Sequence, residues 1–325
     1  MSDYQRADFS PLAETIYGIG FHWTTWTWGR NGPPKPFEEA VETFDVPAFV
    51  AQAVEAGAGH VMITATHELH WLPGPNPEVD RILPGRTCRR DLMMEIADGL
   101  AAADIRFMLY YNHGTWKPPW APKYVQDPAW QEAVGALDKD RRRYYDNYCR
   151  VVGWMGEHYG PKVMAFWMDS GYEHARFSDT PWERFTAAAK AGHPGRLVTY
   201  NSGVFSQQSY TPCQDFWAGE VNGINFVPAT TRTTPNGLPW YAFCAWACYD
   251  DWFQHAAWGL DEKNHDRAWK CPPSQAVVNF ITQFRHRKGA VTLNLLCYQD
   301  GSAYAGDLET MKGVKAILRS KGAGA

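Results

Sequence analysis

The sequence predicts an α/β protein folded as a single (β/α)8 TIM barrel that spans residues 1–325. Three observations favour this fold: short apolar runs alternate with helical segments along the chain, the helical segments carry capping residues, and polar side chains follow the apolar runs. Strands joined by helical crossovers must run parallel. Eight such units with a repeat of about 40 residues suit a barrel with long loops.

Eight apolar runs are the predicted strands. In chain order they cover residues 17–23, 60–65, 106–111, 163–168, 197–200, 215–220, 240–245 and 290–295. The pattern is least regular in the fifth and sixth runs.

The segments between the runs have the spacing of one helix face. The apolar positions are Val46, Phe49, Val50, Ala53 and Val54 after the first run, Leu92, Ile96 and Leu100 after the second, and Val277, Ile281 and Phe284 before the last. Asp45 and Asp91 precede two of these helices as predicted caps, and Gly57 ends the first.

Three Pro- and Gly-rich loops follow predicted strands, at residues 31–36, 72–84 and 117–123. In a barrel these loops build the active-site face, so their length indicates an elaborated pocket. The chain also holds 16 Trp, 16 Tyr and 16 Phe. Aromatic rings stack on sugar rings, and they also fill tightly packed cores, so composition leaves both interpretations open.

Charge and cysteine content exclude several classes of protein. The chain has 31 basic and 35 acidic side chains without a long run of one sign, so we expect no nucleic-acid or membrane partner. We find no signal peptide and no run of about 18 apolar residues, which predicts a cytoplasmic protein. Seven cysteines do not imply a complete disulfide framework. The sequence has no Gly-x-Ser-x-Gly motif of serine hydrolases. It also has no nucleotide-binding motif, and we expect no cofactor.

Polar side chains stand where six of the predicted strands end. They are His22, His67 with Glu68, Asn112 with His113, Asp169, Asn201 and Glu220. Any one of them could be a satisfied structural residue, but six corresponding positions predict a catalytic pocket.

Asp169 is the predicted nucleophile because it follows a nearly continuous apolar run. The alternative is that it caps the next helix through the turn Asp169-Ser170-Gly171. A second carboxyl group must protonate the leaving oxygen of a glycoside. Glu220, Glu68 and Glu173 are the candidates, in that order of preference.

The run His67-Glu68-Leu69-His70 is one residue short of the zinc motif H-E-x-x-H. A metal site would need a third ligand from elsewhere in the chain. We therefore expect no metal, and metal-dependent hydrolysis stays a minor alternative.

Several ordered stretches resemble the catalytic barrel of the α-L-fucosidases, glycoside hydrolase family 29. They are Tyr17-Gly-Ile-Gly-Phe-His-Trp23, Thr64-Ala-Thr-His67, Arg90-Asp-Leu92, Phe166-Trp-Met-Asp169 and Gly289-Ala-Val-Thr-Leu-Asn294. The last-but-one is similar to the family's W-x-D, which holds the nucleophile. The resemblance implies a retaining reaction through a covalent glycosyl-enzyme. It also implies that His22, His67, Tyr111 and Trp167 line the sugar subsite; we add Trp23, Glu68 and Asn201 to the expected lining.

Departures from the family pattern bear on the substrate. Glu68 replaces the family's second His, no Arg follows Asn201, and Tyr298 stands where the family has Pro. A further β-sandwich domain common in the family is not expected after Ala325. Polar contacts decide between related sugars, so the reaction type carries over better than fucose itself.

The leading hypothesis is a retaining, exo-acting α-glycosidase on an L-fucose-like or related sugar, with a small carbohydrate as its partner. One alternative is a barrel glycosidase that works by inversion, elimination or transglycosylation. Another is a non-catalytic carbohydrate-binding barrel. A homo-oligomer is a further expectation.

Overall fold

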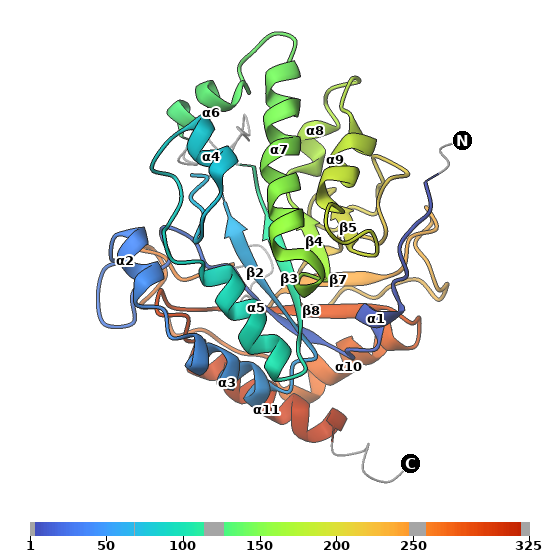
Figure 1. Cartoon of the computed structure of the whole chain (residues 1–325). Coiled ribbons are helices and arrows are strands. Elements are labelled where there is room, and N and C mark those ends of the chain that lie inside the picture. The colour runs from blue at the N-terminus through green and yellow to red at the C-terminus, as the bar shows by residue number, and fades with distance from the viewer. Residues whose placement is uncertain (1–3, 68, 114–126, 247–257, 320–325) are drawn as a thin grey trace.

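The computed structural model describes residues 4–67, 69–113, 127–246 and 258–319 (Figure 1). Eight parallel strands form one sheet in the order β5-β4-β3-β2-β1-β8-β7-β6, which confirms the predicted (β/α)8 barrel. The strands are β1 Gly18–Phe21, β2 His60–Thr66, β3 Arg106–Tyr111, β4 Ala165–Met168, β5 Leu197–Tyr200, β6 Glu220–Asn222, β7 Tyr241–Ala245 and β8 Ala290–Leu295.

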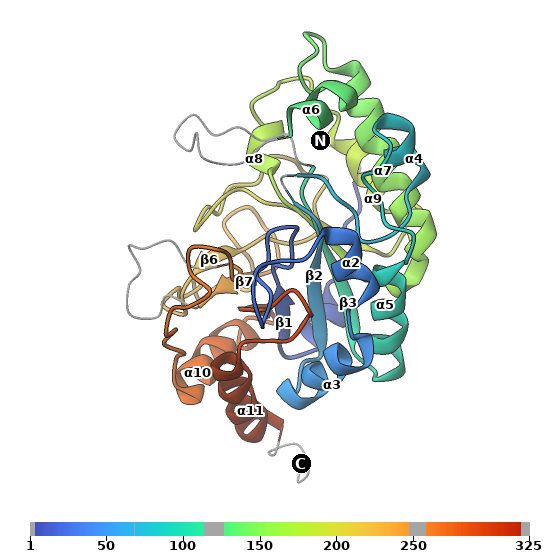
Figure 2. The same ribbon diagram turned by 90° about the vertical axis from the view of Figure 1, so that its left-hand side faces the viewer.

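Helices surround this sheet, as the two views at right angles show (Figures 1 and 2). In the described ranges they are α1 Ser10–Ala13, α2 Phe37–Glu42, α3 Val46–Ala56, α4 Pro77–Ile82, α5 Leu92–Ala102, α6 Pro128–Val134, α7 Arg142–Tyr159, α8 Gly171–His174, α9 Trp182–Ala189, α10 Ser274–Arg285 and α11 Ala305–Arg319, with a 3-10 turn at Gly160–Lys162. None of the helices in the described part of the chain has both the length and the apolar character needed to cross a bilayer.

Capping residues set the helix ends as predicted. The Asp45 carboxylate accepts a 2.9 Å bond from the Ala48 amide at the start of α3, and Asp91 accepts one of 3.1 Å from Met94 at the start of α5. Gly57 ends α3 with a positive φ of 69°, a conformation that costs glycine little. Val54 is an exception to the predicted stripe, because it is 46% exposed on α3.

The predicted sixth strand is wrong in its position. Regular pairing begins only at Glu220, while residues 215–219 bridge β5 and β7 irregularly. The Asp215 amide donates to Val198, the Trp217 amide to Pro239, and Phe243 to Gly219. The Asp215 side chain accepts the Val198 amide at 2.8 Å, so a carboxylate replaces a backbone acceptor at the closure of the barrel.

Two apolar cores result from this closure. The outer core lies between the sheet and the helices, and the inner core fills the barrel with residues such as Met62, Met108, Trp167 and Phe243. Leu12 on α1 belongs to the inner core and closes the amino-terminal end of the barrel. Polar groups also lie in the barrel at this end, where His60 Nε2 lies 2.7 Å from the Thr292 hydroxyl. A barrel of this kind builds its active site at the opposite end, where the strands finish.

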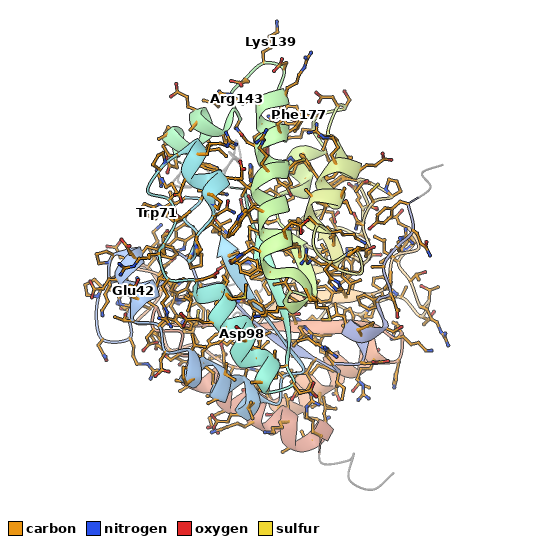
Figure 3. All side chains as sticks on the ribbon, in the orientation of Figure 1. Glu42, Trp71, Asp98, Lys139, Arg143 and Phe177 are labelled. Atoms are coloured by element: carbon orange, nitrogen blue, oxygen red, sulfur yellow. The ribbon has the colours of Figure 1, made fainter. Side chains whose placement is uncertain are left out.

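That opposite end carries the loops that follow the strands. Helix α7 begins there, and Figure 3 places Lys139, Arg143 and Phe177 together at this end of the molecule. Lys139 precedes α7, Arg143 lies in the first turn of α7, and Phe177 follows α8. The carboxyl ends of the strands thus open toward two of the predicted loops, at residues 31–36 and 72–84. The third predicted loop, at residues 117–123, lies outside the described residues.

Candidate active site

Three neutral donors hold the carboxylate of Asp169, which follows the last residue of β4. The Tyr110 hydroxyl and the Asn112 amide donate to Oδ2 at 2.6 and 2.8 Å, and the Asn201 amide donates to Oδ1 at 2.8 Å. Bonds of this kind fix the direction of the carboxylate. No described amide of α8 bonds to it, so Asp169 serves the pocket and does not cap the helix.

Glu220 is the other carboxyl group at this end of the barrel. It opens β6, and its Oε2 accepts a 2.7 Å bond from the Asn201 amide. Burial, followed by the nearby charge of Asp169, raises the pKa of Glu220 to about 8. The bond from Asn201 opposes this shift only in part. At neutral pH Glu220 therefore carries a proton that it can give away.

Asn201 joins the two carboxyl groups through a single nitrogen. Bonds of 2.8 Å to Asp169 and 2.7 Å to Glu220 keep the two accepting oxygens at most about 5.5 Å apart, which is the sum of the two lengths. The amide cannot rotate freely, because its Oδ1 accepts a 2.9 Å bond from the Gly203 amide. The end of β5 thus sets the spacing between a residue on β4 and one on β6.

Histidines and aromatic rings form the wall opposite these carboxyl groups. His22 and His67 meet edge to face at 4.7 Å, and both contact the ring of Tyr110, at 4.9 and 5.7 Å. Burial lowers the pKa of His67 to about 3. Burial, followed by electrostatic repulsion from His67, also lowers the pKa of His22. Both imidazoles are therefore neutral, and each can donate one hydrogen bond and accept one. Trp258 packs 5.7 Å from His22, and Trp26 packs 5.2 Å from His67.

Trp167 forms the floor beneath Tyr110. The two rings stack at 5.1 Å with an angle of 17°, and the Trp167 Nε1 donates to the Ala218 carbonyl at 2.8 Å. Phe243 contacts the same indole edge to face at 5.3 Å. The inner core therefore ends in an aromatic layer directly below the carboxylate pair.

The structure brings together five of the predicted side chains, namely Asp169, Glu220, Asn201, His22 and His67, with Trp167 below them. Trp23 and Tyr111 lie elsewhere. The Trp23 ring packs on Phe44 at 5.4 Å in the outer core, and the Tyr111 hydroxyl bonds to His113 at 2.5 Å. Glu68 lies outside the described residues.

Glu173, the third candidate acid, lies on α8. Its carboxylate pairs with Arg176 at 3.2 Å. Of the candidates in the described ranges, Glu220 is the one that shares a partner with Asp169.

Sequence reasoning missed Tyr110, which donates to Asp169, and chose its neighbour Tyr111. Side chains alternate between the two faces of a strand. Asn112 continues the direction of β3 and lies two positions after Tyr110, so its polar character was a signal that Tyr110 and not Tyr111 points into the barrel.

A metal has little support here. Among residues 4–67, 69–113, 127–246 and 258–319 no three His, Cys, Asp or Glu side chains are grouped as metal ligands. His70 is occupied, because its Nε2 lies 3.1 Å from the Tyr111 hydroxyl and its ring stacks on Trp130 at 3.7 Å.

Comparison with known proteins points in one direction. A family model described as alpha-L-fucosidase matches residues 4–232. No curated protein matches the sequence.

Among solved structures, alpha-L-fucosidase isoenzyme 1 from Paenibacillus thiaminolyticus has 18% identity and a TM-score of 0.67, over 97% of this chain and 76% of that one. Alpha-L-fucosidase AlfC from Lactobacillus casei, in complex with its alpha-L-fucose product, has 15% identity and a TM-score of 0.64, over 97% and 99%. The endo-fucoidan hydrolase P5AFcnA of glycoside hydrolase family 107 has 12% identity and a TM-score of 0.65, over 97% and 95%. At these identities the likeness concerns the fold.

Proposed function

Because the chain belongs to the alpha-L-fucosidase family of glycoside hydrolases, we propose that it is a retaining, exo-acting α-glycosidase that removes an L-fucose-like sugar from a small carbohydrate. Asp169 is the proposed nucleophile and Glu220 the proposed acid and base. His22, His67 and Asn201, with Trp167 beneath, are the proposed sugar contacts. We also propose that the barrel acts as one catalytic unit, without a nucleic-acid or membrane partner.

The proposed first step forms a bond between Asp169 and the anomeric carbon. The Asp169 oxygen attacks this carbon while Glu220 gives its proton to the departing glycosidic oxygen, so the leaving group exits as an alcohol. Glu220 is then an ionised base. In the second step it takes a proton from water, the water oxygen attacks the anomeric carbon, and the bond to Asp169 breaks.

One observation carries the choice of a retaining reaction: Asn201 donates one bond to each carboxyl group and keeps their oxygens at most about 5.5 Å apart. Retaining glycosidases hold their carboxyl groups at about 5–5.5 Å, whereas inverting enzymes need roughly 6.5–9.5 Å to admit a water. This spacing supports the retaining arrangement over the inverting one.

The environment of the two carboxyl groups supports their different roles. Three donors orient the Asp169 carboxylate, which suits a nucleophile. Burial keeps a proton on Glu220 up to a pH of about 8. Two carboxyl groups with such different surroundings are the usual basis for a division into nucleophile and acid.

The proposal is tested with aryl α-L-fucosides and related α- and β-glycosides. Asp169→Gly should lose several orders of magnitude in kcat. In the unmodified protein, a 2-fluoro fucosyl fluoride should leave a covalent adduct on Asp169 that mass spectrometry detects. Asp146→Asn is the matched control, because Asp146 is an exposed carboxylate on α7 that pairs with Arg184. Near-normal turnover by Asp169→Gly would refute the role of Asp169.

Proton NMR of the first sugar released decides the stereochemistry. We expect the α-anomer to appear first. A β-anomer would replace the retaining mechanism with inversion, and a dehydrated product would indicate elimination. Sedimentation analysis separately tests the proposed homo-oligomer.

A further inference from the structure

A small cavity lies behind His67, between the loops that follow β1 and β2. Thr24, Thr25, Phe37, His67, His70 and Trp71 are among the residues that line it. Three of their polar atoms are buried and have no hydrogen-bond partner among the described residues, namely Thr25 Oγ1, His67 Nδ1 and His70 Nδ1. His70 itself is fully buried.

Buried polar atoms without partners are costly. The three residues that carry these atoms line one cavity, and the cavity has room for about one water molecule. A water that makes three hydrogen bonds is the common solution for such a group. We propose that Thr25 and His70 hold one water molecule behind His67, and that this water keeps the proton of His67 on Nε2, facing the sugar.

The direction of each hydrogen bond follows from the neighbouring tyrosine. The Tyr111 hydroxyl lies 2.5 Å from His113 Nδ1 and 3.1 Å from His70 Nε2. A hydroxyl donor makes the shorter bond, and an N–H donor makes the longer one. Tyr111 therefore donates to His113 and accepts from His70 Nε2. His70 Nδ1 is then a bare acceptor that faces the cavity.

This assignment fixes the remaining protons. The water donates one hydrogen to His70 Nδ1. The Thr25 hydroxyl proton has no described acceptor, so the water oxygen accepts it. The second hydrogen of the water is left for His67 Nδ1, which must accept it. A neutral imidazole has one proton, and in His67 that proton is consequently on Nε2.

The position of His67 gives this proton a use. Its ring lies parallel to Tyr110, at 5.7 Å and 10°, in the wall opposite Asp169. No hydrogen bond joins Nε2 to a described residue, and in this inference Nε2 is the nitrogen that is turned to the pocket. An N–H donor at this place would bond a hydroxyl of the bound sugar. This part of the inference rests on the function proposed above. Thr25 and His70 act through His67 and are positioning residues.

The test measures the tautomer directly. Nitrogen-15 NMR of histidine-labelled protein distinguishes the protonated ring nitrogen from the bare one, and assignment uses His67→Gln. We expect His67 to be neutral with its proton on Nε2 in the unmodified protein. Thr25→Val removes the hydroxyl at nearly constant volume, so the two tautomers should become mixed. Thr25→Ser should restore the single tautomer.

Thr24→Val is the matched control. Thr24 lines the same cavity, but its hydroxyl already has a partner in Thr27 at 3.3 Å. The His67 signals should stay unchanged in this variant. His67 protonated on Nδ1 in the unmodified protein, or a single Nε2 tautomer that survives Thr25→Val, would overturn the inference.

Kinetics provide the second readout. Thr25→Val should lower kcat/KM by about tenfold, the size of one hydrogen bond, and Thr25→Ser should recover it. The NMR result does not depend on activity, so the tautomer inference can fail while Asp169 still forms its adduct. Conversely, loss of the adduct would refute the proposed function and leave the tautomer measurement intact.

Discussion

The link that Asn201 makes between Asp169 and Glu220 leads to a prediction with two readouts. Asn201→Ala removes bonds of 2.8 and 2.7 Å to the two carboxyl groups. Hydrogen bonds to charged groups contribute about 1.5–3 kcal/mol, and 1.4 kcal/mol corresponds to a factor of ten. Tyr110 and Asn112 still hold Asp169 in this variant. We therefore expect kcat/KM to fall by about 10–100-fold, and not to vanish.

The pH profile is the sharper readout. Glu220 must be protonated to donate, so kcat/KM falls as the pH rises through its pKa of about 8. Burial and Asp169 raise this pKa, and the bond from Asn201 lowers it. Asn201→Ala removes the lowering contribution, so the basic limb should move to higher pH while activity falls.

Asn112→Ala is the control for this experiment. Asn112 donates to Asp169 at 2.8 Å, whereas burial, Asp169 and Asn201 are the causes of the shifted pKa of Glu220. This variant should also lose activity, but its basic limb should stay near its original pH. The assay is the pH dependence of kcat/KM on an aryl α-L-fucoside, with thermal unfolding to confirm the fold. A basic limb that stays in place or falls in Asn201→Ala would refute the assignment of Glu220 as the acid.

Two further predictions concern stability. Burial raises the pKa of Asp307 to about 6; the folded protein therefore holds this proton more tightly than the unfolded chain, and stability is lost as pH rises from about 4 to 6. Asp307→Asn should remove up to about 3 kcal/mol of that loss. The measurement is the free energy of urea unfolding at pH 4 and at pH 7. If the free energy differs between these two pH values as much in the variant as in the unmodified protein, the expectation is contradicted. Asp215→Ala should cost about 3–5 kcal/mol, because it leaves the Lys190 ammonium, 2.9 Å away, and the Val198 amide unpaired. Asp146→Ala breaks the exposed pair with Arg184 and should lower the free energy of unfolding by less than about 1 kcal/mol. Equal losses of stability in the Asp215 and Asp146 variants would refute the role of Asp215 in closing the barrel.

The sequence alone determined much of the barrel. The strands β3, β5 and β8 have the predicted bounds, and Asp45, Asp91 and Gly57 act at helix ends as expected. These features depend on local chemistry: a capping carboxylate bonds an amide three residues away, and a glycine adopts positive φ wherever the chain turns. The positions of polar residues after strands likewise placed Asp169, Asn201 and Glu220 at one end.

Only the tertiary structure decided which neighbours face the pocket and how far apart they lie. The strands are buried on both faces, so polarity within β3 does not distinguish Tyr110 from Tyr111, and only Asn112 beyond the strand end gives a signal. For the same reason Trp23 could not be assigned to the outer core. The irregular segment before β6 depends on the Asp215 carboxylate, which reaches a strand 17 residues away. The spacing of Asp169 and Glu220 depends on Asn201, a residue on a third strand. A distance of this kind is set by the closure of the whole ring of strands, and no local pattern in the chain encodes it.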